Sequence, residues 1–562
     1  MAGFLDLQTQ IMKRVPIRII AAFLPLIVGF GARAQEQAIR PLDVPMSFSG
    51  TYGELRHDHF HSGVDWRVGG KVGDPIHAIK SGYISRVSVS PWGYGNGIYV
   101  THPDGTTSVY GHLLRFCEPV ARRVEEAQYD RESFSVDLRF GPDEFPVRQG
   151  DIIGQAGNTG SSAGPHLHME IRDTESDLSL NYLSRSVYRP EDKTAPQFHR
   201  VCFYALDTLP VSGSWRIHNL TNPSAVRDTL RLPSCSYVAV DATDRQEGTP
   251  AKLAVEEYRV SLDDTLLFAF KVGDVATADG RYIKSLIQYS ESRGGGRDLV
   301  KSQVDPNNLL AEKIRSRNDG LIVLRDDAVH VLTLEAYDEH GNRAALRYKV
   351  RRDTTRFRPP ARDTSRTYAP WLWYVQNCLI DGTMSFYLPA GSLYRNVNFP
   401  YRKVGGPDPA RGILSDIWEI GSPDIPLHRA GELEIAAEIP DGLEDKVYMA
   451  HYGRSLPYAG VQVRCGTYCV ALDTVAPVIR FVETKNNIVS GRTIRVRVRD
   501  DASGVASARV EIDGKWYLSM LRSGVVSLEL KENRVRRGKH TIEVTVTDNC
   551  GNERKEKRTF SY

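Results

Sequence analysis

Hydrophobic and polar residues alternate in short runs along the whole chain, and Gly, Pro, Asn and Asp separate these runs. The clearest case is an alternating stretch over residues 97–102, a turn at 103–105 and a second alternating stretch over 106–110. Such a pattern predicts two strands joined as a hairpin. No segment has a long helical period, and residues 120–129 are the best candidate for a short helix. The sequence therefore predicts a mainly β protein.

One pattern occurs twice in the second half of the chain. Each copy opens with an acidic residue shortly before an Ala-Pro pair, continues through an Asp-rich turn and closes on an acidic turn that ends in Gly-Asn. Strand alternation, turn spacing and a length near 90 residues for the last copy are typical of an immunoglobulin-like sandwich, and resemble the Ig-like modules of many bacterial surface and secreted proteins. The matched pieces are 194–196 and 475–477, 241–244 and 500–504, and 336–342 and 546–552.

With 562 residues the chain is too long for a single hydrophobic core, so several domains are expected. Proline-containing linkers and the repeat suggest where these domains begin and end. The predicted division is a signal peptide over 1–34, a catalytic domain over 35–190, an Ig-like β-sandwich over 191–353, a separate β-rich domain over 354–472 and a second Ig-like β-sandwich over 473–562.

The N-terminus has the features of a secretory signal. Lys13, Arg14 and Arg18 precede an apolar stretch over 19–30, and Ala32-Arg33-Ala34 supplies the small residues that a signal peptidase accepts. The apolar stretch is shorter than the roughly 20 residues needed to span a bilayer, so no transmembrane segment is expected after cleavage. A secreted protein in the periplasm, outside the cell or at the cell surface is therefore predicted, and the sequence does not distinguish between these places.

Charge and cysteine content narrow the function classes. The formal net charge of +3 comes from residues 1–34, which hold four basic residues and one acidic residue, so the mature chain is neutral. A neutral chain has no overall charge with which to attract nucleic acid or an anionic membrane, and no nucleic-acid partner is expected. Seven cysteines, an odd number, leave at least one thiol unpaired in a monomer, and their pairing cannot be deduced.

Eight of the fifteen histidines lie between residues 57 and 168. Three groups stand out: His61 with Asp65 four residues later, His112 at the end of the predicted hairpin, and the pair His166 and His168. Side chains at i and i+2 of a strand share one face, so the paired histidines project together. A catalytic zinc needs three protein ligands and an open position, and His61, Asp65 and one histidine of the pair supply that count.

Several other polar residues nearby have plainer interpretations. His102 is expected to be structural, and His57 and His59 lack the spacing of His61 relative to Gly63 and Asp65. Glu170 shares the face of the histidine pair. It is expected either to orient a metal ligand or to satisfy buried backbone groups.

Four ordered elements within residues 48–175 resemble the lysostaphin/LytM-type zinc metallopeptidases. They are H-x-x-x-D at 61–65, G-x-P-I-x-A at 73–78, Y-G-H-L at 110–113 and G-N-T-G-x-S-x-G-P-H-L-H-x-E at 157–170. The resemblance implies a compact antiparallel β fold with an open groove. It also implies Zn²⁺ held by His61, Asp65 and His168, with His112 and His166 as catalytic histidines.

The same resemblance implies a metalloendopeptidase that hydrolyses peptide stems or cross-links of bacterial peptidoglycan. The alternative is a non-catalytic LytM-like regulator or cell-wall-binding protein, although such members typically lose metal ligands. The later domains are expected to bind glycan or a protein partner, or to act as spacers. Residues 115–145 form a charged insertion relative to the shorter members, and it is expected to build one wall of the groove.

Overall fold

The computed structural model describes most of the chain after its N-terminal stretch. Residues 38–562 form one compact unit, and the predicted signal peptide at 1–34 lies outside the described residues. The described ranges are 37–56, 59–183, 185, 188, 191–206, 213–246, 251–293, 298–451, 462–482, 484–485, 488–489 and 492–562.

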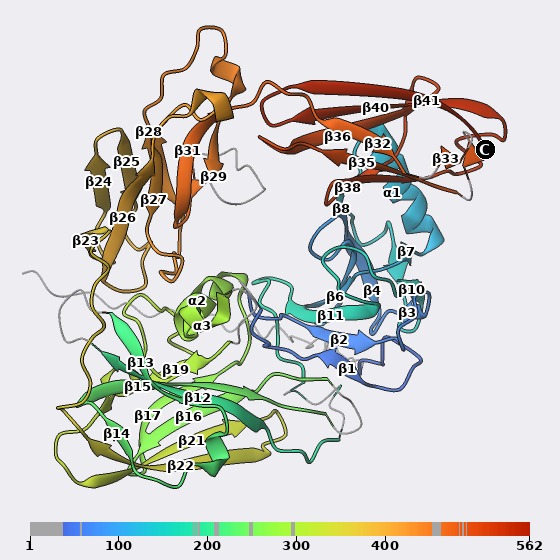
Figure 1. Ribbon diagram of the computed structural model, residues 1–562. Helices are drawn as coiled ribbons and strands as arrows, with labels where there is room; N and C mark the ends of the chain where they lie inside the picture. Colours follow the sequence, from blue (N-terminus) through green and yellow to red (C-terminus); the bar gives the residue numbers. More distant parts are fainter. Residues whose placement is uncertain are drawn as a thin grey trace, which may run out of the picture. The chain divides into compact units, whose positions relative to one another are not determined.

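Antiparallel sheets dominate the described residues, which confirms the mainly β prediction (Figure 1). The first sheet has eight strands and includes β11, which holds His166 and His168, β2, which holds Asp65 and follows His61, and β6, which ends just before His112. Six strands run through it in the order β1-β2-β11-β6-β5-β4, followed by β8 at the edge, while β9 pairs with β4. Their bounds are β1 Phe48–Gly50, β2 Val64–Arg67, β4 Gly82–Val89, β5 Asn96–Thr101, β6 Thr106–Gly111, β8 Val136–Arg139, β9 Pro146–Val147 and β11 His166–Asp173.

The expected hairpin is formed by β5 and β6, and a small second sheet has the strand order β3-β10-β7. Its strands are β3 Pro75–His77, β7 Arg115–Phe116 and β10 Ile152–Gln155. The expected helix is α1 Glu118–Asp130, which begins with proline in its first turn and buries Val120, Val124 and Ala127 on one face.

The charged insertion does not form a wall of the groove, contrary to the sequence prediction. All of residues 115–145 are described, and none of them lines the groove that contains the histidines. The insertion adds α1 and β8 instead, and β8 pairs with β4. Because β4 is three strands away from β11, the insertion extends the far edge of the sheet.

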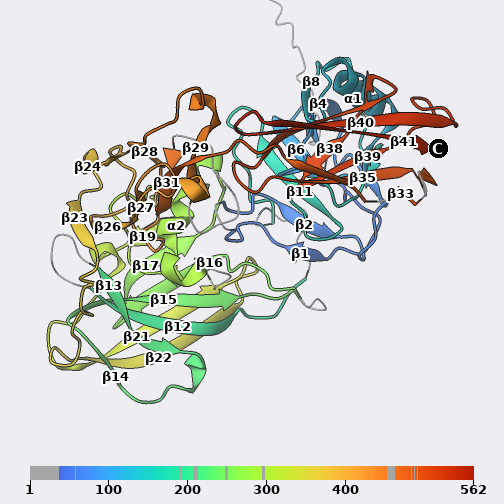
Figure 2. The same ribbon diagram turned by 45° about the horizontal axis from the view of Figure 1, so that its top comes forward.

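Strand register places the site. In the antiparallel pairs formed by β11, His168 lies opposite Asp65 of β2 on one side and opposite Gly111 of β6 on the other. The alternate residues Leu167 and Met169 are fully buried in the core, as their period of two requires. Figures 1 and 2 show β1, β2 and β11 side by side in both views.

Residues 197–352 form two further sheets that pack as a sandwich. One has the order β13-β12-β15-β18 with β20 beside β15, and the other has the order β14-β22-β21-β16-β17-β19. Their bounds are β12 Gln197–Leu206, β13 Ser214–Leu220, β14 Leu230–Leu232, β15 Cys235–Thr243, β16 Glu257–Leu262, β17 Thr265–Lys271, β18 Val300–Lys301, β19 Ile314–Ser316, β20 Ile322–Val323, β21 Val329–Tyr337 and β22 Arg343–Arg352. Two short helices, α2 Ile283–Leu286 and α3 Tyr289–Ser292, interrupt the strands.

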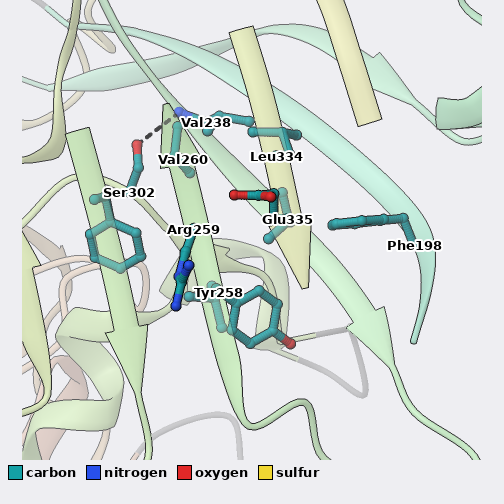
Figure 3. A pocket seen from close by; sticks show the side chains of 11 residues that line it. Phe198, Val238, Tyr258, Arg259, Val260, Ser302, Leu334 and Glu335 are labelled. Atoms are coloured by element: carbon teal, nitrogen blue, oxygen red, sulfur yellow. Dashed lines mark hydrogen bonds between the residues drawn. The ribbon is translucent and has the colours of Figure 1, made fainter. Parts of the chain in front are cut away.

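Side chains from both sheets meet in the interior of this sandwich (Figure 3). Val238 of β15 donates its backbone N–H to the hydroxyl of Ser302 at 3.3 Å. The pocket between the sheets has an interior of only about 10 Å³, which is near the lower limit for a single water molecule. It is a packing gap in the core and offers no room for a substrate.

The remaining described residues form four more sheets, in the orders β23-β26-β27-β31-β29, β24-β25-β28-β30, β32-β35-β39-β38 and β33-β34-β41-β40-β36-β37. Up to residue 472 the strands are β23 Thr367–Trp371, β24 Asn377–Asp381, β25 Met384–Leu388, β26 Val397–Gly405, β27 Ile417–Ile420, β28 Gly431–Ile435, β29 Val447–His451, β30 Gln462–Val463 and β31 Gly466–Leu472. After it they are β32 Val478–Phe481, β33 Thr484–Lys485, β34 Ile488–Val489, β35 Thr493–Arg499, β36 Val505–Ile512, β37 Lys515–Trp516, β38 Met520–Arg522, β39 Val525–Glu529, β40 Lys539–Asp548 and β41 Glu553–Ser561.

All seven cysteines have free thiols. Within the described part of the chain, no helix is both long enough and apolar enough to cross a bilayer.

Candidate metal centre

Three side chains predicted as metal ligands converge on one point. Nε2 of His61 lies 2.9 Å from Oδ1 of Asp65 and 3.0 Å from Nδ1 of His168. The third side of the triangle, from His168 Nδ1 to Asp65 Oδ1, is 2.9 Å. Each of the three residues is at most 7% exposed. Two imidazole nitrogens and one carboxylate oxygen at such mutual distances are the donor set of a tetrahedral metal ion with one open position.

A glycine allows β2 to approach β11 closely enough for this convergence. A Cβ on Gly63 would lie 2.4 Å from the carbonyl oxygen of Met169 and 2.9 Å from Cε1 of His168. Any side chain at position 63 would therefore push the loop that carries His61 away from His168. This contact explains why glycine stands between His61 and Asp65 in the motif.

Hydrogen bonds on the far side of each ring fix which imidazole nitrogen faces the centre. Nδ1 of His61 donates to the carbonyl oxygen of Thr51 at 2.7 Å. Nε2 of His168 donates to Oε1 of Glu170 at 2.8 Å. Nε2 of His61 and Nδ1 of His168 are therefore the nitrogens left to face the centre. Burial would lower the pKa of His168, but Asp65 and Glu170 raise it to about 9, so a metal ion that binds Nδ1 displaces a proton.

Glu170 is fully buried and is held as a carboxylate by four partners. Besides His168, it accepts hydrogen bonds from Ser62 at 2.7 Å, Tyr94 at 2.5 Å and Arg172 at 2.6 Å. Burial alone would raise the pKa of Glu170, but His168 and the Arg172 guanidinium outweigh it and lower that pKa far below its usual range. Glu170 thus remains charged and orients His168.

Arg56 controls the orientation of the third ligand. Its guanidinium donates to Oδ2 of Asp65 at 3.1 Å, so Oδ1 is the oxygen that faces the two histidines. Burial would raise the pKa of Asp65, but the charge of His61 and hydrogen bonds from the nearby histidines lower it well below the usual value. Asp65 therefore supplies a negative charge to the centre.

His112 and His166 flank the metal-binding group without belonging to it. Their ring centroids are 4.7 Å apart, and Nε2 of His166 lies 3.4 Å from Oδ1 of Asp65. Nδ1 of His112 donates to the carbonyl oxygen of Thr159 at 2.8 Å, and Nδ1 of His166 donates to that of Gly164 at 2.8 Å. Each ring therefore keeps Nε2 as the nitrogen available for chemistry.

The backbone and the surroundings of His112 are unusual. It has a φ of 63°, in the left-handed region that non-glycine residues rarely adopt and that is often found at functional sites. Burial, followed by the charges of His168 and His166, lowers the pKa of His112 to about 4. A neutral imidazole at pH 7 is able to accept a proton.

These residues lie in a groove of about 780 Å³, a size typical of small-ligand sites. Its lining includes His61, Asp65, His112, His166 and His168. His59 also lines the groove, whereas His57 lies outside the described residues. His102 is buried elsewhere, with Nδ1 3.0 Å from the carbonyl oxygen of Ser81 and Nε2 2.8 Å from the Ser108 hydroxyl, as expected of a structural histidine.

Two stretches of the chain match known domain families. Residues 59–129 match peptidase family M23, and residues 371–473 match the Zu5-like domain. The first match includes His61, Asp65 and His112, and the motif with His166 and His168 follows it. The chain carries an M23 metallopeptidase domain. The metal-binding group of this M23 domain is intact.

Relatives of the M23 domain include a DD-carboxypeptidase/endopeptidase, Mpg, from Neisseria meningitidis serogroup B, which is 31% identical over 112 residues. Lysostaphin from Staphylococcus simulans is 32% identical over 111 residues. These alignments cover 20% of this chain, and 20% and 17% of the respective relatives, so the similarity is limited to one domain. The solved catalytic domain of lysostaphin from Staphylococcus simulans matches with 28% identity over 23% of this chain and 79% of that chain, with a TM-score of 0.17.

Sequence reasoning did not identify three residues that organise the M23 domain's centre. Arg172 follows the same period of two as His168 and Glu170, so the strand pattern contained a signal for it. Arg56 and Tyr94 come from loops, and no local pattern in the sequence connects them with Asp65 or Glu170.

Proposed function

We propose that the chain is a secreted zinc metalloendopeptidase that hydrolyses peptide cross-links or stems of bacterial peptidoglycan. The observation that carries the proposal is the triangle of His61 Nε2, Asp65 Oδ1 and His168 Nδ1, with sides of 2.9–3.0 Å. Two imidazole nitrogens and one carboxylate oxygen suit Zn²⁺, which takes nitrogen and oxygen ligands in tetrahedral sites.

The names of the relatives support the choice of substrate. Mpg is a DD-carboxypeptidase/endopeptidase, a protein from Staphylococcus capitis is a glycyl-glycine endopeptidase, and ShyC from Vibrio cholerae is a peptidoglycan DD-endopeptidase. All act on peptide bonds, and one is named for peptidoglycan. The open groove beside the metal-binding group is consistent with an extended peptide substrate.

His112 and His166 carry the proton transfers in the proposed mechanism. Zinc, when bound, supplies a Lewis acid that polarises the scissile carbonyl and makes water acidic enough to ionise near neutral pH. Because Nδ1 of each histidine donates to a backbone carbonyl, each presents Nε2 to the groove. One imidazole takes the proton of the attacking water, and the other stabilises the charge that develops on the substrate oxygen.

Glu170, Arg56 and Thr51 act as positioning residues in this scheme. Glu170 and Thr51 hold the two ligand imidazoles in the required tautomers, and Arg56 turns Oδ1 of Asp65 toward them. Glu54 also lines the groove, but it pairs with Arg56 and accepts a hydrogen bond from the backbone N–H of Thr51, so His112 and His166 are the proposed acid and base.

The other domains and the place of action belong to the same proposal. Residues 1–34 direct export, and the Ig-like sandwiches and the β-rich domain hold the peptidase near glycan or a protein partner, or act as spacers. The basis for export is the leader composition described above. Mass spectrometry of the protein recovered from cells is expected to show a mature chain that begins at Gln35, whereas an intact leader would contradict export with cleavage.

Digestion of purified sacculi tests the enzymatic proposal against the alternative of a regulator. The zinc-loaded chain is expected to release peptide fragments, to lose this activity after treatment with a chelator, and to regain it when zinc is restored. A folded chain that holds stoichiometric zinc yet releases nothing would favour the non-catalytic regulator. The His166→Ala variant serves as a matched control, because it leaves the three ligands in place.

A further inference from the structure

Three buried aspartates gather at one end of the first sandwich, outside the M23 domain. Asp192 precedes β12, Asp244 follows β15 directly, and Asp338 follows β21 directly. Their exposed fractions are 8%, 1% and 3%. One ligand atom each from Asp192, Asp338 and His340 lies within 4.8 Å of the others.

The carboxylate of Asp244 points to a missing partner in this cluster. Its Oδ1 is buried and has no hydrogen-bond partner. Burial raises the pKa of Asp244 to about 8; a backbone hydrogen bond at Arg245 opposes this rise, and the charges of Glu339, Asp338 and Asp192 add to it. A buried carboxylate oxygen without a donor is costly, and most buried polar atoms are therefore paired.

No lysine or arginine described by the structure compensates for the aspartates, and His340 is the one basic side chain in the group with Asp192 and Asp338. Among the residues that the structure describes, no Lys or Arg forms an ion pair with Asp192, Asp244 or Asp338. Buried carboxylates that converge without a positive charge repel one another and are each penalised by the loss of water. A divalent cation would relieve both effects at once.

The same arrangement recurs in the C-terminal repeat. Ligand atoms of Asp473, Asp500 and Asp548 lie within 4.8 Å of one another, and these residues occupy the positions that match Asp192, Asp244 and Asp338 in the sequence repeat. Each cluster also contains an asparagine at the matched position of the repeat, and this asparagine donates hydrogen bonds to two of the cluster's aspartates. Asn342 donates to the Asp192 carbonyl oxygen and to Asp338 Oδ2, and Asn552 donates to the Asp473 carbonyl oxygen and to Asp548 Oδ2.

We propose that Asp192, Asp244 and Asp338 bind a Ca²⁺ ion in the first sandwich. Three carboxylates are hard oxygen ligands of the kind that Ca²⁺ prefers, and the counterpart cluster offers carboxylates alone, which disfavours a softer metal. The ion gives Asp244 Oδ1 the partner that it lacks. It also ties the segment that enters β12 to the ends of β15 and β21. This site is independent of the proposed zinc peptidase activity.

Calcium titration of the full-length, zinc-loaded chain tests the proposal by calorimetry. The wild type is expected to bind Ca²⁺ and to unfold at a higher temperature in its presence. Asp244→Asn keeps the shape of the side chain and is expected to remove one equivalent of bound Ca²⁺ or to weaken it at least tenfold. Asp327→Asn is the matched control, because that carboxylate is in the same sandwich but is 67% exposed.

The variant Asp500→Asn separates the two clusters. It leaves the first cluster intact, so Ca²⁺ binding that persists in Asp500→Asn and disappears when Asp244→Asn is added supports the proposal. A wild-type chain that binds no Ca²⁺ at millimolar concentration overturns it. Loss of all Ca²⁺ binding in the single variant Asp500→Asn overturns it as well. This outcome can be measured even if the Asp244→Asn protein does not fold.

Discussion

His168 and Asp65 face each other across the pair formed by β11 and β2, with Nδ1 and Oδ1 2.9 Å apart. This cross-strand relationship brings together two residues separated by 103 positions in the chain. His61, from the loop before β2, completes the group. The centre thus depends on one strand register, and a slip by one residue would turn His168 into the core.

Replacing the two histidines of β11 separates metal binding from catalysis. His168→Ala is expected to lose zinc and activity together, because it removes one of three ligands. His166→Ala is expected to retain zinc and to lose roughly 10²–10⁴-fold in rate, the usual range for one acid–base group. Elemental analysis and sacculus digestion of both purified variants check this. A His168→Ala protein that still holds one equivalent of zinc would contradict the ligand assignment.

Glu170→Gln tests the support of His168. The amide removes the charge that Arg172 and His168 share, and we expect zinc affinity to fall about 10–100-fold, as is typical for partners of metal ligands. Competition with a chromophoric chelator measures the affinity. Asp177→Asn is the matched control, because Asp177 also pairs with Arg172 but is 69% exposed. Equal affinities for the two variants would show that Glu170 does not orient the ligand.

Gly63→Ala tests the close approach of β2 and β11. The added Cβ would lie 2.4 Å from the Met169 carbonyl oxygen, so we expect a loss of about 1–3 kcal/mol in the free energy of unfolding and weaker zinc binding. Thermal and denaturant unfolding measure the change. Gly141→Ala is the control, since its nearest neighbour would be 3.7 Å away. Wild-type stability in Gly63→Ala would contradict the steric argument.

Removal of the metal is expected to destabilise the peptidase domain. An ion that binds only the folded state adds about 4 kcal/mol when its free concentration is 1,000 times Kd. We therefore expect a chelator to lower the unfolding temperature and added zinc to restore it. The His168→Ala variant should show no such response. An identical unfolding temperature with and without chelator in the wild type would argue against a bound ion.

Local patterns predicted the elements of the site better than they predicted its surroundings. The hairpin of β5 and β6, the helix α1 and the shared face of His166 and His168 follow from short-range periodicity. The contact of Arg56 with Asp65 depends on how a loop folds back on the sheet. The prediction that residues 115–145 build a wall of the groove was wrong for a similar reason, because composition does not reveal which sheet edge an added strand joins.

The two ligand histidines present opposite ring nitrogens, Nε2 from His61 and Nδ1 from His168. An asparagine amide reaches about as far from the backbone as Nδ1 does, whereas a glutamine amide reaches about as far as Nε2. Amide replacements at the two positions are therefore not interchangeable: Asn suits position 168 and Gln suits position 61. A variant of this centre designed to bind its metal more weakly would therefore use a different amide residue at each of the two positions.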